Sequence, residues 1–286
     1  MRSTRFRAAA AVLAALALTA TACGGDDETG GSATDAPTTP AATGDETTDP
    51  GDVGEVTTIR DGVLTVCSEI PYPPFEFEDP DTGEFTGFDI DLITAVAEQL
   101  GLEASVVNTG FEGIQSGAAM EAGQCDIAAS ALTITEQRAA NIDFTDPYFQ
   151  EEFSLLVKAD SGITTLADLA GKAIGVQSET TGADYAAENA PDDATITDFS
   201  GGADAIIALQ AGQVDAVLQD TGPNAEAAAN DDTLEIVEVY ESDAFYGFGI
   251  AKGQNDALLA AVNDALETLR SDGTYDAVFE KYFPGA

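Results

Sequence analysis

Short apolar runs and longer amphipathic stretches alternate along the chain from residue 62 onward. Residues 63–66 form an apolar run typical of a buried strand, and similar runs follow at residues 105–107 and 127–129. Between the first two runs, residues 88–100 repeat apolar side chains at helical spacing. Alternation of strands and helices at this spacing predicts an α/β fold with mostly parallel sheets.

Two stretches carry the clearest helical pattern. In residues 88–100, Asp89 is placed to cap the helix and Gly101 to end it. A second amphipathic helix is predicted over residues 256–270, where its simplest role is packing against the first half of the fold. The inward positions of the two helices are Leu92, Ile93, Val96, Ala97 and Leu100, and Leu258, Leu259, Val262, Leu266 and Leu269.

One short segment occurs twice. Residues 122–128 read Ala-Gly-Gln-Cys-Asp-Ile-Ala, and residues 211–217 read Ala-Gly-Gln-Val-Asp-Ala-Val. Each copy follows a helical stretch, turns on a glycine and enters a strand. The repeat fits either a chance likeness of turn chemistry or two lobes on one plan. In the second case strand ends from both lobes face a shared cleft, where open α/β sheets bind ligands.

The N-terminus reads as a targeting segment. Arginines precede an apolar run at residues 8–20, which is shorter than the roughly 20 apolar residues that span a bilayer. Residues 1–22 are therefore predicted to be a signal peptide. Cys23 follows small residues, as in lipoproteins whose cysteine is acylated after cleavage, although an ordinary secretory signal with an incidental cysteine is the alternative. Residues 23–52 lack large apolar side chains and indicate a disordered tether, so the globular body begins near residue 53.

Composition and charge exclude several classes of function. The 286 residues include 52 acidic and 10 basic residues, for a net charge of −42, and no histidine. Nucleic acid is excluded as a partner because phosphate binding needs clustered Lys and Arg. Without histidine there is no histidine triad and no imidazole metal ligand, so we expect no metal and no cofactor. An exported chain invites a disulfide between Cys67 and Cys125. However, one lies near the end and the other near the start of its predicted strand, which leaves the bond open.

Five motifs occur in order along the chain: residues 70–76 (IPYPPFE), 87–92 (GFDIDL), 132–138 (LTITEQR), 144–148 (FTDPY) and 168–172 (DLAGK). Together they resemble the polar amino-acid class, family 3, of extracellular solute-binding proteins that serve ABC importers. The resemblance covers residues 63–283. It implies a two-lobed, periplasmic-binding-protein-like fold, with each lobe a mostly parallel sheet flanked by helices. Lobe 1 would comprise residues 53–153 plus 247–286, and lobe 2 the inserted residues 157–243. Two crossover strands, with hinges near residues 153–158 and 244–251, would let the lobes close on a ligand.

A free amino acid has a carboxylate and an ammonium group, and each must be matched when a closing cleft removes its water. Arg138 lies in the first turn of a short helix, where its guanidinium can grip a carboxylate with two hydrogen bonds, and the family uses the matching arginine in this way. The alternative is a surface arginine paired with Asp143. Ser130, Thr133 and backbone N–H groups near Ala131 could complete the site, or could serve only as turn and cap residues.

The second lobe would supply the rest of the site. Thr181 matches the family's ligand-contacting threonine at a helix N-terminus, a natural seat for a carboxylate. Asp220 ends a strand and aligns with the family's ammonium-binding aspartate, with helix capping as its alternative role. Relatives commonly have glycine where this chain has Glu179, which leaves the local geometry open.

By the same resemblance, Glu69, Tyr72 and Phe111 form the pocket for the ligand side chain. Two aromatic faces and a carboxylate favour a cationic amino acid such as arginine. We therefore expect a lipid-anchored binding protein on the extracellular face of the membrane, which passes an amino acid to an ABC-type permease. One alternative is a dehydratase-type enzyme on the same fold, with Glu69 or Glu179 as general acid. Another is a ligand-sensing surface protein.

Overall fold

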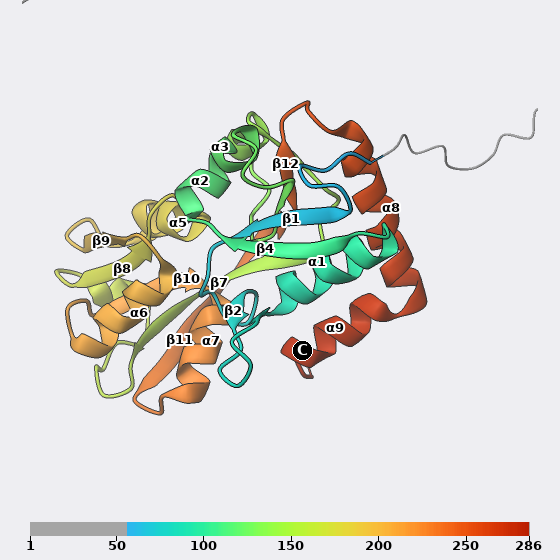
Figure 1. Ribbon diagram of the computed structural model, residues 1–286. Coiled ribbons are helices and arrows are strands. Elements are labelled where there is room, and N and C mark those ends of the chain that lie inside the picture. Colours follow the sequence, from blue (N-terminus) through green and yellow to red (C-terminus); the bar gives the residue numbers. More distant parts are fainter. Residues whose placement is uncertain (1–55, 286) are drawn as a thin grey trace, which may run out of the picture. The chain divides into compact units, whose positions relative to one another are not determined.

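The computed structural model describes residues 56–285. The predicted signal peptide, Cys23 and the whole tether lie outside this range. The described chain forms two five-stranded sheets and one small two-stranded sheet (Figure 1). Across these residues, no helix combines the length and the apolar character needed to cross a bilayer.

The first sheet has the strand order β4-β1-β5-β12-β6. Strands β4 and β5 run parallel to β1, and only β12 runs antiparallel to its neighbours, so this sheet is mostly parallel. We call this sheet and its helices lobe 1. Its strands are β1 (Val63–Ser68), β4 (Glu103–Asn108), β5 (Ile127–Ala128), β6 (Ile142–Phe144) and β12 (Gly249–Ala251), with the hairpin β2 (Phe77–Glu78) and β3 (Phe85–Thr86) beside it. Its helices are α1 (Phe88–Gln99), α2 (Phe111–Gln115), α3 (Ala118–Glu121), α4 (Glu136–Ala139), α8 (Asp256–Asp272) and α9 (Thr274–Tyr282).

The second sheet has the strand order β11-β7-β10-β8-β9. Strands β10, β8 and β9 are parallel, and β7 runs antiparallel between β10 and β11. We call this sheet and its helices lobe 2. Its strands are β7 (Phe149–Lys158), β8 (Ala173–Gln177), β9 (Thr195–Phe199), β10 (Ala216–Asp220) and β11 (Leu234–Tyr246). Its helices are α5 (Thr181–Asn189), α6 (Gly202–Ala211), α7 (Thr221–Asn230) and the 3₁₀ turn η1 (Leu166–Leu169).

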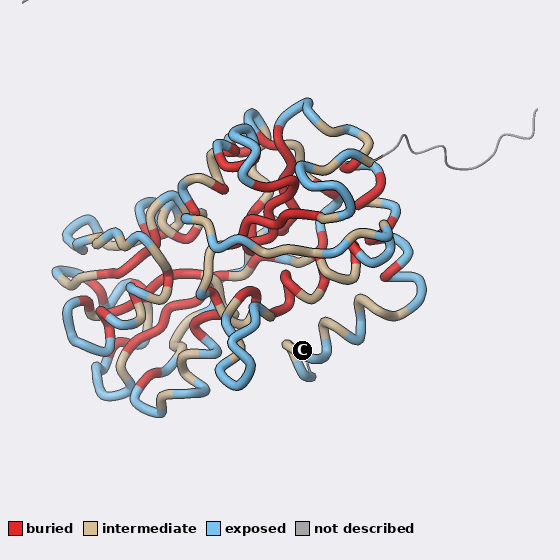
Figure 2. Tube along the Cα trace, in the orientation of Figure 1, coloured by how far each residue is buried: buried red, intermediate tan, exposed pale blue. Residues whose placement is uncertain are grey.

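The predicted periodicity matches the buried faces. Strands β1 and β10 are almost wholly buried and lie within the red interior of Figure 2. The predicted helices at residues 88–100 and 256–270 are confirmed as α1 and α8, which share one core with β1. Each helix buries the predicted apolar stripe because the 3.6-residue repeat keeps those side chains on one face. The fully buried members of the stripe are Leu92, Ile93, Val96, Ala97, Leu258, Val262 and Leu266.

Asp89 does not cap helix α1, contrary to the prediction. The N-cap is Gly87, at φ 130°, and no side chain caps the helix. A Cβ at Gly87 would collide with the carbonyl of Phe75, so only glycine lets the helix begin this close to the preceding loop. The close approach places Asp89 in the first turn with its side chain fully buried.

The chain first crosses between the sheets earlier than expected. Residues 153–158 are not a free connection, because they pair with β10 on one side and β11 on the other inside the second sheet. The first crossing is the short segment between β6 and β7 at residues 145–148. The second crossing is residues 247–248, between β11 and β12.

Cys67 and Cys125 form a disulfide, with their Cα atoms 5.6 Å apart. Parallel strands could have kept the two Cα atoms too far apart for a bond. They do not, because β5 begins only at Ile127 and Cys125 lies in the loop before it. Both residues are buried in a small apolar cluster beneath α2 and α3. The bond therefore ties the loop before β5 to strand β1.

Candidate functional site

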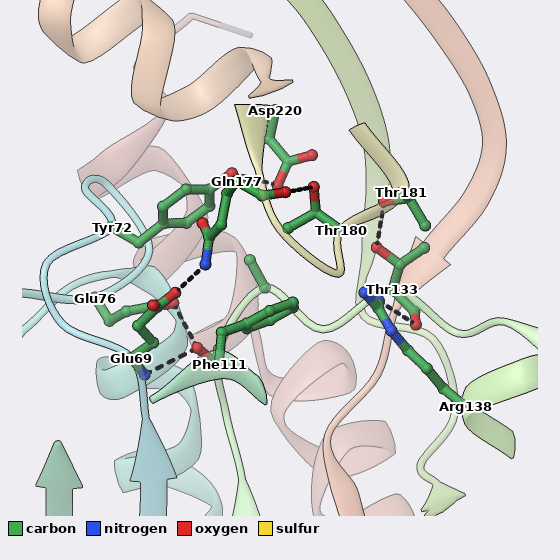
Figure 3. Close-up of a pocket in the computed structure, with 12 residues that line it drawn as sticks. Glu69, Tyr72, Glu76, Phe111, Thr133, Arg138, Gln177, Thr180, Thr181 and Asp220 are labelled. Carbon is green, nitrogen blue, oxygen red and sulfur yellow. Dashed lines mark hydrogen bonds between the residues drawn. The ribbon is translucent and has the colours of Figure 1, made fainter. Parts of the chain in front are cut away.

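One pocket is lined by residues of both lobes (Figure 3). Every predicted ligand residue except Glu179 lines it. The lining is Glu69, Tyr72, Glu76, Phe111, Ser130, Ala131, Thr133, Arg138, Gln177, Thr180, Thr181 and Asp220. The lobe 2 residues of this set follow strands β8 and β10 or end them, as expected for open α/β sheets.

Arg138 is a buried cation on helix α4. Only 5% of the residue is exposed. Its two terminal nitrogens donate to the carbonyl oxygens of Thr133 and Glu179, each over 3.0 Å, so the side chain spans the two lobes. Within residues 56–285 no carboxylate lies within ion-pair distance of the guanidinium; Asp143, the alternative partner, pairs with Lys252 at 2.7 Å. Burial lowers the pKa of Arg138, although the charges of Glu151, Asp220 and Asp184 act in the opposite direction.

Thr133 and Thr181 meet across the lobes. Their hydroxyl oxygens are 3.3 Å apart, and both donate to one oxygen of Glu151, at 2.6 and 2.7 Å. Glu151 belongs to β7 and is buried. Thr181 is the first residue of α5, whose N-cap is Thr180, so the free N–H groups of that helix point into the pocket region.

Asp220 ends β10 and stands at the N-cap of α7, yet its side chain makes no capping bond. Instead it accepts a hydrogen bond of 2.7 Å from the Tyr72 hydroxyl of the opposite lobe. Burial and the nearby charge of Glu151 raise the pKa of Asp220 to about 7, although bonds from Tyr72 and Tyr246 and the charge of Arg138 act in the opposite direction. The alternative role of a capping aspartate is therefore wrong.

Glu69 occupies the other end of the pocket. The side-chain amide of Gln177 donates to Glu69 over 2.6 Å, again from one lobe to the other. Burial raises the pKa of Glu69. The ring of Phe111 lies between these two ends, with the guanidinium carbon of Arg138 5.3 Å from its centre.

Ser130 and Ala131 form the loop between β5 and α4. The Ser130 hydroxyl donates to Glu76 over 3.0 Å and accepts from the backbone N–H of Glu69 over 3.0 Å. The backbone N–H of Ala131 donates to Asp89 over 2.8 Å, and Ala131 has a φ of 42°, unusual for a residue with a side chain. Buried carboxyl groups therefore hold this loop from below.

Glu179 does not line the pocket. Its φ of 63° lies in the left-handed region, which explains why a glycine suits this position. The backbone carbonyl accepts from Arg138, and the side chain accepts from Gln115 over 3.2 Å at an exposed position. The position therefore contributes its backbone, while the carboxylate stays outside.

Replacing Glu179 separates these two contributions. Glu179→Val should lower the free energy of unfolding by about 1–2 kcal/mol, because a branched side chain tolerates the left-handed region worst. Glu179→Gly, the matched control, should not lower it to that extent. Urea unfolding of both variants measures the difference, and equal destabilisation by valine and glycine would contradict the assignment of backbone strain.

The sequence reasoning missed several pocket residues. Gln177 and Thr180 line the pocket, and Glu76 closes it from below. Gln177 ends β8 as Asp220 ends β10, so its place at a strand end was the available signal. Glu76 gave no such signal, because its contact with Ser130 joins residues 54 positions apart.

Known proteins share both the sequence pattern and the fold. The model of "Bacterial extracellular solute-binding proteins, family 3" matches residues 64–285. The chain belongs to this family. The ABC transporter arginine-binding protein 1 of Escherichia coli (strain K12) is 32% identical over 217 residues, covering 74% of this chain and 87% of that protein. The L-cystine-binding protein TcyJ of the same strain is also 32% identical, covering 78% and 83%.

Solved structures of the family superimpose on the chain. An ancestral arginine-binding protein bound to arginine has a TM-score of 0.72 at 36% identity, covering 78% of this chain and 98% of that one. An ancestral amino-acid-binding protein, described as a precursor of cyclohexadienyl dehydratase, has a TM-score of 0.68 at 36% identity, covering 78% and 95%. The two-lobed fold expected from the motifs is therefore confirmed. The curated relatives are transport proteins, so the chain is a solute-binding protein of the amino-acid class and not an enzyme.

Proposed function

We propose that this solute-binding protein holds one free amino acid between its lobes, with Arg138 on the α-carboxylate and Asp220 on the α-ammonium. The observation that carries the proposal is a buried guanidinium without a carboxylate partner among the described residues, in one pocket with the half-buried carboxylate of Asp220 from the other lobe. A zwitterion supplies the two missing partners at once. Each charged side chain then gains an oppositely charged partner in the closed pocket, in place of the water that it loses on closure.

The α-carboxylate has a second set of donors beside Arg138. Thr181 opens helix α5, and the first N–H groups of a helix favour an anion through both hydrogen bonding and the helix dipole. Thr133 faces Thr181 across the pocket. A carboxylate bound here would contact both lobes and so favour their closure, since a ligand shifts such an equilibrium only through its greater affinity for one state.

A cationic side chain, such as that of arginine, fits the charge of the pocket best. Glu69, Glu76 and Asp220 line it together with the single cation Arg138. A neutral amino acid would leave Glu69 without a positive partner. A guanidinium could lie between Tyr72 and Phe111 and reach Glu69, with a cation–π contribution of about 0.5–2 kcal/mol. Relatives named for arginine and for cystine are equally similar in sequence, so the support for a cation comes from these side chains.

Calorimetry with the twenty amino acids tests the proposal. We expect one-to-one binding, tightest for arginine or lysine, with glutamine weaker and glutamate weakest. No binding of any free amino acid at micromolar concentration would overturn the amino-acid function. Tightest binding of glutamate would overturn only the preference for cations.

Glu69→Gln should reduce the preference for arginine over glutamine by about tenfold or more. The amide keeps the shape of the side chain and removes its charge, and a close charge pair in a desolvated pocket contributes at least 1.4 kcal/mol. The ratio of the two dissociation constants measures this effect. Glu179→Gln, which changes a carboxylate outside the pocket, is the matched control, and an unchanged ratio in Glu69→Gln would remove Glu69 from specificity.

We further propose that the protein is anchored by a lipid on Cys23 at the extracellular face and passes its ligand to an ABC-type permease. The support is the signal-like N-terminus and the polar tether. Motion of the lobes about residues 145–148 and 247–248 would signal occupancy to the permease. Incorporation of a labelled fatty acid, lost in Cys23→Ser, is the expected result; equal labelling of both proteins would contradict the anchor.

A further inference from the structure

Two buried carboxyl groups lie directly beneath the ligand loop. Glu76 and Asp89 are both 0% exposed. Glu76 Oε1 accepts from the Ser130 hydroxyl, and Asp89 Oδ2 accepts from the N–H of the next residue, Ala131. Asp89 Oδ2 also accepts from the Tyr148 hydroxyl over 2.6 Å. Each carboxyl group thus uses one oxygen to hold the loop.

The second oxygen of each group has no such partner. Glu76 Oε2 and Asp89 Oδ1 are buried and make no hydrogen bond to any described residue. The two residues are close in space, because the N–H of Asp89 donates to the carbonyl of Phe75 over 3.0 Å, and the glycine at position 87 permits this approach. A buried carboxylate oxygen without a donor costs about 1–3 kcal/mol or more, so two in adjacent groups need an explanation.

Protonation is favoured at this place. Burial, followed by the charge of Asp89, raises the pKa of Glu76 well above its usual range. Burial also raises the pKa of Asp89 to about 7, although Tyr148 and the N–H of Ala131 donate to it. The hydrogen bond from Ser130 acts to lower the pKa of Glu76, whereas the nearby carboxylates of Glu69 and Asp220 act to raise it.

We propose that Glu76 Oε2 and Asp89 Oδ1 share one proton, and that this carboxyl pair positions the Ser130–Ala131 loop for the ligand. The pair fixes the direction of the Ser130 hydroxyl. The Ser130 hydroxyl donates its hydrogen to Glu76 and accepts a hydrogen bond from the N–H of Glu69. It can therefore only accept a further hydrogen bond, with its remaining lone pair. Ser130 then serves the ammonium end of an amino acid and not its carboxylate. This consequence rests on the proposed function, whereas the shared proton does not.

Amide replacements test the shared proton because an amide donates from one atom and accepts at the other. In Glu76→Gln the oxygen can still accept from Ser130 while the NH2 group donates to Asp89. In Asp89→Asn the oxygen can still accept from Ala131 and Tyr148 while the NH2 group donates to Glu76. Each single variant should keep the midpoint of urea unfolding close to that of the wild type, since one donor still faces one acceptor.

The double variant Glu76→Gln/Asp89→Asn places two NH2 groups against each other. Either the donors oppose one another, or the amide at position 76 turns and forces the Ser130 hydroxyl to point its hydrogen at the ligand ammonium. We expect arginine affinity to fall roughly ten- to hundredfold relative to either single variant, and the midpoint of urea unfolding to fall as well. If the pair were two repelling carboxylates, the double variant would be the most stable of the series. That result would overturn the proposal.

Infrared difference spectra of the ligand-free protein at pH 8 give a readout independent of binding. The wild type should show the carbonyl band of a protonated carboxyl group, and both Glu76→Gln and Asp89→Asn should lose it. Asp220→Asn, the matched control, should retain the band. A band unchanged in Glu76→Gln would overturn the shared proton. If the wild type bound no free amino acid, the function proposed above would fall, while the spectra and the unfolding series would still decide on the pair.

Discussion

Arg138→Ala should weaken amino-acid binding by at least a hundredfold. The guanidinium is buried, and removing one partner of a buried, hydrogen-bonded charge pair costs about 3–5 kcal/mol. In this variant the ligand carboxylate would still lose its water on closure without gaining a cation. Isothermal calorimetry with arginine measures the loss directly.

Two further variants test whether the loss of affinity comes from the planar guanidinium group of Arg138 and not from a change in overall charge. Arg138→Lys should bind with intermediate affinity, because an ammonium keeps the charge but cannot make two parallel hydrogen bonds to a carboxylate. Lys172→Ala removes a cation whose side chain is 39% exposed and lies 3.9 Å from Asp215. It should bind as the wild type does. Unimpaired binding by Arg138→Ala would rule out the assigned carboxylate site.

Asp220→Asn should weaken binding by about thirty- to a thousandfold. The substitution keeps the size of the side chain and its place beside Tyr72, but it removes the negative charge that faces the ligand ammonium. A buried charge pair that loses one member costs about 2–5 kcal/mol. Asp215→Asn, at a more exposed carboxylate beside Lys172, provides the control and should bind normally.

The pH dependence of binding follows from the same residue. The pKa of Asp220 is raised to about 7 in the protein without ligand, so below that pH the carboxyl group is increasingly protonated and neutral. Only the ionised form matches the ammonium. Affinity should therefore be constant above about pH 7 and fall toward tenfold per unit below it. Asp89 titrates in the same range in both proteins, so the part of the slope that Asp220→Asn abolishes belongs to Asp220. An unchanged slope in the variant would contradict the assignment.

The residues that the sequence placed correctly are those with a local signal. The stripes of α1 and α8 follow from spacing alone, and Arg138, Thr181 and Asp220 stand at strand ends or helix starts within recognisable motifs. Asp89 was misread because its position before an apolar stripe is typical of a cap. Its true partners, Ala131 and Tyr148, are 42 and 59 residues away.

Long-range contacts also explain the other differences. The disulfide depends on how the chain turns before β5, which spacing between Cys67 and Cys125 does not reveal. The sequence prediction placed the first crossing at residues 153–158, which is too late in the chain. A mostly apolar run indicates a buried strand, but it does not show whether that strand joins two sheets or lies within one. Gln177 had a local signal, its place at the end of β8, whereas Glu76 had none, because its partner Ser130 is 54 residues away in the sequence.

The strand order of the first sheet has a consequence for how the chain is made. Strand β12, at Gly249–Ala251, lies between β5 and β6, although it is the last strand to emerge during synthesis or export. All five strands of the other sheet, from Phe149 to Tyr246, are available before it. A chain delivered from its N-terminus can thus complete lobe 2 first. The sheet of lobe 1 keeps unpaired strand edges until its C-terminal segment arrives.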